Sequence, residues 1–174
     1  MDQPEFSHIV KLSEIGAKPK SGKLVASKEE REALALRFDL PKISSLMANY
    51  KLVGAERGIA FTGQIESDVH QSCAITGEAI PVQVREKFDI LFVPKANPDE
   101  IEEEIELTEE ECDLVEYEQA QIDLGEAIAQ TLYLSLDPFP RGPDADAVAR
   151  EKGLKSEQEA GPFGALAALK DKLG

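Results

Sequence analysis

The chain has 174 residues, of which 34 are acidic and 19 are basic, so its net charge is -15. Its hydrophobic content of 42% is typical of a globular protein and excludes a fibrous or fully disordered chain. No stretch approaches the roughly 20 apolar residues of a membrane-spanning helix, and the acidic N-terminus lacks the pattern of a signal peptide. We therefore expect a cytoplasmic protein whose two cysteines, Cys73 and Cys112, stay reduced.

The excess negative charge lies in one part of the chain. Residues 99–118 contain twelve acidic residues and no basic one, whereas residues 1–57 contain ten basic residues against eight acidic ones. A block of carboxylates repels the phosphate backbone of a nucleic acid. The acidic block is therefore a poor candidate for direct nucleic-acid binding.

The N-terminal part predicts a strand, a loop and a helix. Apolar and polar residues alternate over much of residues 6–12, which favours a strand. Residues 16–22 contain two glycines and a proline, which indicate a loop. Ser27 and Glu30 form a capping-box pattern. We expect a helix from there to Phe38, with these side chains buried: Ala33, Leu34 and Phe38.

Three segments then alternate strictly enough to predict strands: residues 46–53, 59–70 and 80–92. A period of two places the apolar side chains of each strand on one face of a sheet. Gly54 and Gly58 mark the first turn, and Cys73–Gly77 marks the second. This pattern predicts an antiparallel meander with one face in water.

The next part combines an acidic insertion, residues 95–118, with a strong helix. Within the insertion, the residues that favour a further strand are Leu114, Val115 and Tyr117. Asp123 is placed to cap the helix, which we expect over residues 123–136 and ended by Pro138. Its apolar stripe comprises Leu124, Ile128, Leu132 and Leu136. This helix should be the main one packed on the sheet.

The predicted fold is α+β, with an antiparallel sheet of four to six strands packed by one main helix. Residues 1–140 should form a single domain. Residues 141–161 are rich in Gly, Asp, Glu and Lys and should form a linker. Residues 162–174 should form a short amphipathic helix, which carries on one side Phe163, Leu166 and Leu169.

The turn at Cys73 has the pattern of a metal-binding knuckle, C-x-x-C-G, except that Thr76 replaces the second cysteine. A structural zinc needs four good ligands, and His70 is the only other local candidate. We therefore expect no metal or cofactor, with Cys73 as a structural turn residue. The alternative is a metal-linked or thiol-dependent enzyme that uses Cys73 and His70, although a thiol nucleophile also needs an oxyanion site.

Four features coincide in order: the hairpin Cys73–Gly77, the strand end Phe88–Pro94, the helix segment Ile122–Pro140 and the tail Pro162–Lys170. Together they resemble the YceD-like family, bacterial and plastid proteins implicated in the accumulation of large-subunit ribosomal RNA. The resemblance covers roughly residues 60–170. It implies a non-catalytic factor in large-ribosomal-subunit biogenesis that supports accumulation of 23S rRNA.

The chain departs from the family pattern at the positions of the cysteines. Many relatives have C-x-x-C in the hairpin, and some have further cysteines near the position of Pro138–Gly142. This chain has Thr76 in the hairpin and no Cys or His after the helix. The resemblance therefore does not carry metal binding over to this protein.

The family role suggests a ribosomal protein or a pre-ribosomal particle as partner. An acidic surface can hold a basic ribosomal protein, and the candidate carboxylates are Glu102, Glu103, Glu104, Glu109, Glu110 and Glu111. The candidate apolar contacts of the tail are Phe163, Leu166 and Leu169, which can instead dock on their own domain. The candidates for a weak rRNA contact are Lys18, Lys20 and Lys23.

Overall fold

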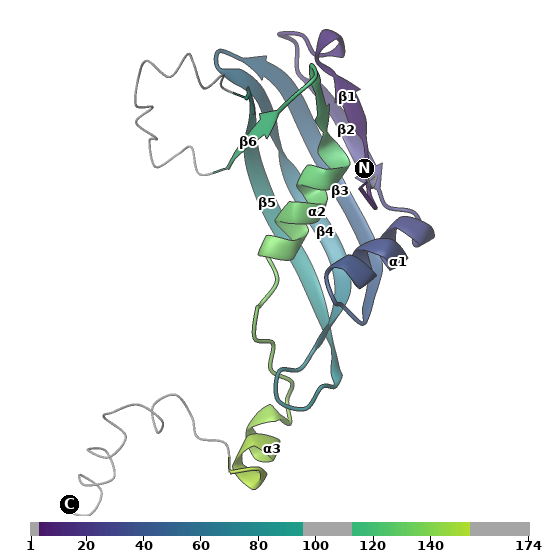
Figure 1. Cartoon of the computed structure of the whole chain (residues 1–174), viewed down its shortest axis with the longest axis vertical. Coiled ribbons are helices and arrows are strands. Elements are labelled where there is room, and N and C mark those ends of the chain that lie inside the picture. The colour runs from purple at the N-terminus through teal and green to yellow at the C-terminus, as the bar shows by residue number, and fades with distance from the viewer. Residues whose placement is uncertain (1–3, 96–112, 154–174) are drawn as a thin grey trace, which may run out of the picture. The chain divides into compact units, whose positions relative to one another are not determined.

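The computed structural model describes residues 4–95 and 113–153, and its fold is α+β (Figure 1). The chain divides into two compact units. Unit 1 comprises Met1–His70 and Pro81–Leu136, and unit 2 comprises Gln71–Ile80 and Asp137–Gly174. Among the described residues, no helix is long and apolar enough to cross a membrane.

The larger sheet has five strands, in the order β2-β3-β4-β5-β6. Their bounds are Lys20–Val25 for β2, Lys42–Ala55 for β3, Gly58–Ser72 for β4, Ala79–Pro94 for β5 and Leu114–Tyr117 for β6. The β2–β3 and β3–β4 pairs are antiparallel. The predicted number of strands is confirmed, and so is the strand predicted at residues 114–117.

Two details of the sheet differ from the prediction. β6 pairs with β5 in parallel, with Leu91 opposite Leu114, because the chain between these strands is long enough to return to the start of a parallel neighbour. Residues 20–22, predicted as loop, belong to β2. β2 pairs only with β3 and is an edge strand, and such strands need little apolar alternation, so glycine and lysine are tolerated there.

A separate two-stranded sheet joins the N-terminal segment to the start of the main helix. β1 (Ile9–Lys11) pairs with β7 (Gln121–Asp123), with Val10 opposite Ile122. A 3-10 turn, η1 (Leu12–Glu14), follows β1. Alternation in residues 6–12 predicted a strand, but its distant partner in the chain was not predicted.

Helix α1 (Lys28–Arg37) starts at the predicted capping box. The Glu30 backbone N–H donates to Ser27 Oγ at 3.2 Å, and the Ser27 N–H donates to Glu30 Oε2 at 2.7 Å. Leu34 is buried as predicted, and Ala35 is buried with it. Phe38 and Ala33, also predicted to be buried, are half-buried. Phe38 is partly exposed because it lies at the helix end and stacks on the partly exposed ring of Tyr133.

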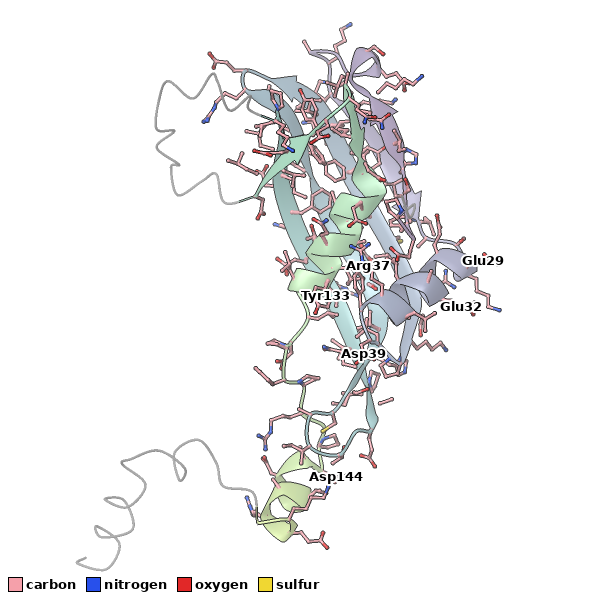
Figure 2. All side chains as sticks on the ribbon, in the orientation of Figure 1. Glu29, Glu32, Arg37, Asp39, Tyr133 and Asp144 are labelled. Atoms are coloured by element: carbon pink, nitrogen blue, oxygen red, sulfur yellow. The ribbon has the colours of Figure 1, made fainter. Side chains whose placement is uncertain are left out.

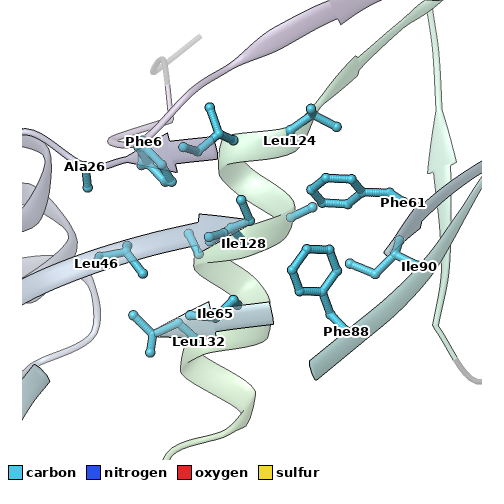
Figure 3. Close-up of a cluster of buried hydrophobic side chains, with 14 of the residues drawn as sticks. Phe6, Ala26, Leu46, Phe61, Ile65, Phe88, Ile90, Leu124, Ile128 and Leu132 are labelled. Atoms are coloured by element: carbon cyan, nitrogen blue, oxygen red, sulfur yellow. The ribbon is translucent and has the colours of Figure 1, made fainter. Parts of the chain in front are cut away.

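Helix α2 (Leu124–Leu134) is the main helix on the sheet, as predicted. Asp123 caps it by accepting hydrogen bonds from the N–H groups of Gly125 and Glu126. Its buried stripe meets apolar side chains from β3, β4 and β5 (Figure 3). The core side chains labelled in that view include Leu46, Phe61, Ile65, Phe88, Leu124, Ile128 and Leu132.

Gly63 makes room for the aromatic part of this core. A Cβ atom at that position would lie 2.2 Å from the Asn49 carbonyl oxygen and 2.7 Å from the Phe88 ring. The rings of Phe61 and Phe88 pack with their centroids 4.7 Å apart, and those of Phe61 and Phe92 lie 5.9 Å apart. These separations are typical of favourable aromatic pairs. A side chain at position 63 would force apart strands that are packed against one another.

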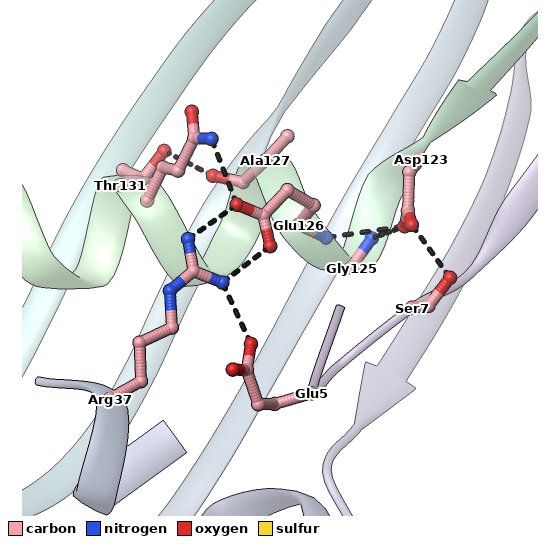
Figure 4. A network of polar contacts seen from close by, with 9 residues as sticks. Glu5, Ser7, Arg37, Asp123, Gly125, Glu126, Ala127 and Thr131 are labelled. Atoms are coloured by element: carbon pink, nitrogen blue, oxygen red, sulfur yellow. Dashed lines mark hydrogen bonds and ion pairs between the residues drawn. The ribbon is translucent and has the colours of Figure 1, made fainter. Parts of the chain in front are cut away.

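A charged network links α1, α2 and the N-terminal segment (Figure 4). Arg37 donates from both terminal nitrogens to Glu126, at 2.6 and 2.8 Å, and also donates to Glu5 at 2.9 Å. The hydrogen bond from Arg37 holds the pKa of Glu126 below its usual range. Such a bidentate arginine–carboxylate pair fixes direction as well as distance. The network therefore holds the end of α1 against the start of α2.

Candidate functional site

The tip of the β4–β5 hairpin forms a tight turn around Cys73, within unit 2. The Cys73 N–H donates to the Glu78 carbonyl at 2.8 Å, and the Gly77 N–H donates to the Cys73 carbonyl at 2.9 Å. Gly77 has a φ of 75°, a left-handed conformation that glycine adopts without steric cost. The predicted hairpin turn is therefore confirmed, and its glycine is required by the backbone.

Thr76, at the position of the missing cysteine, stabilises the turn in another way. Its hydroxyl oxygen accepts a hydrogen bond from the Glu78 N–H at 3.2 Å. Its own backbone N–H donates to Cys73 Sγ at 3.5 Å. Thr76 thus supplies a short polar side chain that satisfies the turn's backbone, but it is not the second thiolate that a metal knuckle needs.

The segment after α2 completes the surroundings of the sulfur. Within unit 2, the Gly142 N–H donates to Cys73 Sγ at 3.4 Å, and the Ala74 N–H donates to the Pro140 carbonyl at 2.8 Å. The same segment, Pro138–Gly142, stands where some relatives were expected to have further cysteines. The structure therefore brings the Cys73 turn and this segment together. The contact was not predicted, because the two segments lie far apart in the chain.

These hydrogen bonds change the acidity of the thiol. The Gly142 N–H has the largest effect, followed by the side chain and N–H of Thr76 and the N–H of Ile75, and together they lower the pKa of Cys73 to about 6. Each donor stabilises the thiolate more than the thiol. These donors favour the thiolate form of Cys73, whose residue is only 3% exposed. Its surroundings do more than the structural turn role predicted from sequence requires.

Two nearby polar groups in the hairpin have incomplete hydrogen bonding. Gln71, in unit 2, is 5% exposed, and its Nε2 donates to the Asp137 carbonyl at 2.8 Å while its Oε1 has no partner among the described residues. His70, in unit 1, was expected to lie in water but is half-buried, and its buried Nδ1 likewise has no partner in the described part of the chain. Alternation predicts which face His70 occupies, but not what surrounds it.

The described residues contain no cluster suited to a metal ion. Nowhere in residues 4–95 and 113–153 do three His, Cys, Asp or Glu side chains lie close enough together to hold one. The groups that contact the sulfur of Cys73 are backbone N–H groups, those of Thr76 and Gly142. These are donors and cannot ligate a cation.

The three lysines proposed for RNA contact do not form one surface. Lys18 is exposed and precedes β2, while Lys20 and Lys23 are exposed on β2 itself. Because they are three residues apart in a strand, Lys20 and Lys23 point to opposite faces of the sheet. The structure therefore separates two residues that the sequence had grouped.

Lys23 has a different basic neighbour, Lys51 of β3. In the register of β2, β3 and β4, one row contains Ser21, Lys51 and Thr62, and the next contains Lys23, Asn49 and Gln64. We call these six residues the basic rows. They lie on the face opposite the buried side chains and contain no carboxylate. Alternation in residues 46–53 already placed Lys51 on the polar face, but its pairing with β2 required the tertiary register.

The acidic insertion, residues 95–118, begins and ends at one edge of the sheet, and we call it the acidic segment. The Leu91 N–H donates to the Asp113 carbonyl at 3.0 Å, and the Lys95 N–H donates to the Tyr117 carbonyl at 3.2 Å. The candidate carboxylates lie outside the described residues: Glu102, Glu103, Glu104, Glu109, Glu110 and Glu111. The candidate tail contacts also lie outside them: Phe163, Leu166 and Leu169.

Comparison with known proteins gives one match. No curated protein and no solved structure is significantly similar to the chain. A family model described as "Large ribosomal RNA subunit accumulation protein YceD" matches residues 61–170, from within β4 through the Cys73 turn and α2 to the tail. The match spans well over half of the chain, and so the chain belongs to the YceD family of large ribosomal RNA subunit accumulation proteins.

Proposed function

We propose that this protein is a non-catalytic factor in biogenesis of the large ribosomal subunit, which supports accumulation of 23S rRNA by binding a basic ribosomal protein or a pre-ribosomal particle. Membership of the YceD family carries this proposal. The charge distribution supports it, because twelve acidic residues within residues 99–118 suit a basic partner. Such a factor acts in the cytoplasm, where ribosomal subunits are assembled.

In this proposal the acidic segment is the main contact. Both of its ends are held at the edge of the sheet by β5 and β6, so the carboxylates are tethered to a folded unit. Ribosomal proteins carry basic surfaces that bind RNA phosphates. A carboxylate-rich segment competes for these surfaces and suppresses non-specific binding until assembly. Salt should weaken the complex, because exposed charges are screened.

The contact with rRNA is the weaker part of the proposal. Lys23 and Lys51 supply two cations on the basic rows, with hydroxyl and amide side chains beside them. Two phosphate contacts give a weak, salt-sensitive interaction without base readout. RNA should therefore strengthen binding to a particle without fixing its sequence. The tail residues Phe163, Leu166 and Leu169 remain candidates for an apolar contact with the partner.

The arrangement around Cys73 supports a structural role over the thiol-dependent alternative. The sulfur accepts hydrogen bonds from Thr76 and Gly142, and the residue is 3% exposed. A low thiol pKa would suit a nucleophile, but a nucleophile must also reach its substrate, which a residue with this exposure does not. We therefore assign no catalytic residue.

Affinity purification of the tagged protein tests this function. The purification is done at low and high salt, each with and without nuclease, and the bound proteins and RNA are identified. We expect ribosomal proteins or precursor particles at low salt, with protein capture surviving nuclease. Recovery of neither ribosomal protein nor rRNA under any condition would exclude the assembly role.

A charge-reversal variant tests the contact itself. Replacing Glu102, Glu103 and Glu104 by lysine should strongly reduce capture of a basic partner. The matched control replaces three exposed carboxylates outside the acidic segment, Glu14, Glu86 and Asp89, by lysine and should leave capture intact. Equal capture by both variants would remove the acidic segment from the mechanism while leaving the family role untouched.

A further inference from the structure

A hollow of about 600 Å3 lies beside α1 and the start of β3, entirely within unit 1. Figure 2 labels Glu32 on α1 and Asp39 in the turn that follows it, which locates this part of the molecule. The hollow is lined by Lys28, Arg31, Glu32, Ala35, Leu36, Leu40, Pro41, Lys42, Ile43 and Ser44. Its size lies within the range of ordinary ligand pockets. We call it the α1–β3 hollow.

Half of the lining residues are apolar, and some of them are in contact with water. Leu36 is 84% exposed, Pro41 is exposed and Leu40 is half-buried. A single exposed leucine is common on protein surfaces. Here the exposed leucine lines the same hollow as the exposed proline and a half-buried leucine. The arrangement offers a place for an apolar side chain of a partner.

The charged residues of the hollow are mostly basic. Lys28, Arg31 and Lys42 line it together with a single carboxylate, Glu32. Lys28 and Glu32 form an ion pair at 3.7 Å, but both side chains are about 70% exposed, and such pairs are weak. The α1–β3 hollow is therefore locally positive in a protein of net charge -15.

Arg31 contributes its guanidinium to the lining of the α1–β3 hollow. Its Nη1 donates to the Ala26 carbonyl at 2.8 Å, while its buried Nε has no acceptor among the described residues. Arg31 also lines a neighbouring hollow of about 240 Å3. A buried donor without an acceptor is rare and unfavourable. A carboxylate is the acceptor that a guanidinium binds best in geometry.

We infer that the α1–β3 hollow binds an acidic, apolar peptide segment of a partner protein. Its apolar side chain lies against Leu36 and Leu40, and its carboxylates pair with Arg31 and Lys42. The apolar side chains of the hollow disfavour RNA, because phosphates bind exposed cations and gain nothing from apolar neighbours. The hollow therefore selects an acidic partner, whereas the acidic segment is proposed to bind a basic one. The test below does not depend on the proposed role in ribosome biogenesis.

Fluorescence anisotropy with two short labelled peptides tests the inference on the full chain. Both peptides contain two central leucines, flanked by glutamates in one and by lysines in the other. We expect the glutamate peptide to bind at least about tenfold more tightly than the lysine peptide at low salt, corresponding to about 1.4 kcal/mol. Tighter binding of the lysine peptide, or equal binding of the two, would overturn the inference.

Surface variants then place the binding site. Leu36→Glu and Lys42→Glu should each weaken the glutamate peptide by about tenfold or more. The matched control is Leu134→Glu, since Leu134 is also 81% exposed but lies on α2, away from this hollow, and it should bind as the original protein does. Thermal unfolding confirms that each variant is folded. Undiminished binding by Leu36→Glu would exclude the hollow.

A binding measurement with RNA tests whether the hollow binds RNA instead of an acidic peptide. A labelled uridine oligonucleotide of similar net charge should bind the original protein and the Leu36→Glu variant alike. Arg31→Lys, which keeps the charge but loses the planar guanidinium that pairs with carboxylates, should weaken the glutamate peptide more than the oligonucleotide. An oligonucleotide that binds more tightly than the peptide and is lost in Leu36→Glu would assign the hollow to RNA instead.

Discussion

The α2-covered sheet and the Cys73 turn are held together by different forces. In unit 1, side chains of β3, β4, β5 and α2 form one continuous apolar core, and its largest buried members include Phe61 and Leu132. In unit 2, the described turn is held mainly by hydrogen bonds, several of which converge on one sulfur. Loss of one apolar contact should lower the stability of the core at any pH. The stability of the turn should depend on whether Cys73 is protonated.

The difference explains how the turn can retain its shape without a second cysteine. Burial of apolar area stabilises the sheet without specifying any single polar atom. In the turn, directed hydrogen bonds from backbone N–H groups hold the chain and contact the sulfur. Protonation of the Cys73 sulfur weakens the hydrogen bonds that it accepts from these donors. The turn should therefore respond to pH in a range where the core does not.

The largest effect should come from the core. Phe61→Ala should lower the free energy of unfolding by about 3–5 kcal/mol, because it removes a fully buried ring from an aromatic cluster. Urea denaturation followed by circular dichroism measures this. Leu134→Ala, at an exposed position, is the control and should change stability by less than about 0.5 kcal/mol. A comparable loss in both variants would contradict the assigned core.

The charged network should come second. Glu126→Gln should lower the free energy of unfolding by about 1–2 kcal/mol, because Arg37 loses its bidentate carboxylate at a partly buried site. The exposed ion pair provides the control, since Glu32→Gln removes the partner of Lys28 and should have almost no effect.

Acid should distinguish these two variants further. Arg37 lowers the pKa of Glu126 in the folded protein, so the unfolded state binds the proton first. The stabilisation is present above the ordinary carboxylate pKa and is lost as pH falls through the folded pKa. Stability measured across the acidic range should therefore depend less on pH in Glu126→Gln. An unchanged pH dependence would show that the pair contributes nothing.

The Cys73 thiol should titrate near pH 6. Thiolate absorbance at 240 nm, measured in a Cys112→Ser background, should show this midpoint in the original turn and lose it in Cys73→Ser. Because folding lowers the pKa, its stabilisation is complete above the ordinary thiol pKa. It declines as pH falls and is gone below about 6. A midpoint above pH 8 would mean that the hydrogen bonds to the sulfur do not form in solution.

The smallest effect should come from one hydroxyl. Thr76→Val removes the side-chain donor that helps to lower the pKa of Cys73, so the pKa should rise toward its ordinary value while the Gly142 N–H still acts. Thr76→Ser, which keeps the hydroxyl, should leave the titration almost unchanged. If valine and serine give the same midpoint, only backbone groups control the acidity of this thiol.

Local sequence patterns predicted helices and turns more successfully than they predicted the surroundings of individual side chains. The capping box at Ser27, the Asp123 cap and the apolar stripe of α2 are set by neighbouring residues. The structure confirms both caps and three stripe residues, Leu124, Ile128 and Leu132. The helix ends at Leu134, two residues earlier than predicted, so that the fourth, Leu136, is buried beyond its end. β2 was partly predicted as loop because an edge strand pairs on one side only and tolerates glycine and lysine. The segment predicted as a linker contains α3 (Ala145–Glu151), whose only buried residue is Ala145, too weak a pattern to detect.

The candidate site shows the same division. Cys73 and the replacement at Thr76 were recognised from the turn pattern, because ligand spacing in a knuckle is local. The approach of Gly142 to the sulfur, the pairing of Ser21 with Lys51 and the unsatisfied Nε of Arg31 join distant segments or depend on burial. No period in the sequence reports such contacts.

By itself, the sequence determined the α+β class, the main helix, the hairpin turn and the position of the acidic block, because each follows from residue spacing and charge along the chain. Only the tertiary structure decided the parallel entry of β6, the separation of Lys20 from Lys23 and the low pKa of Cys73. These features depend on strand register and on which backbone groups surround a side chain. Both arise when segments far apart in the chain pack together.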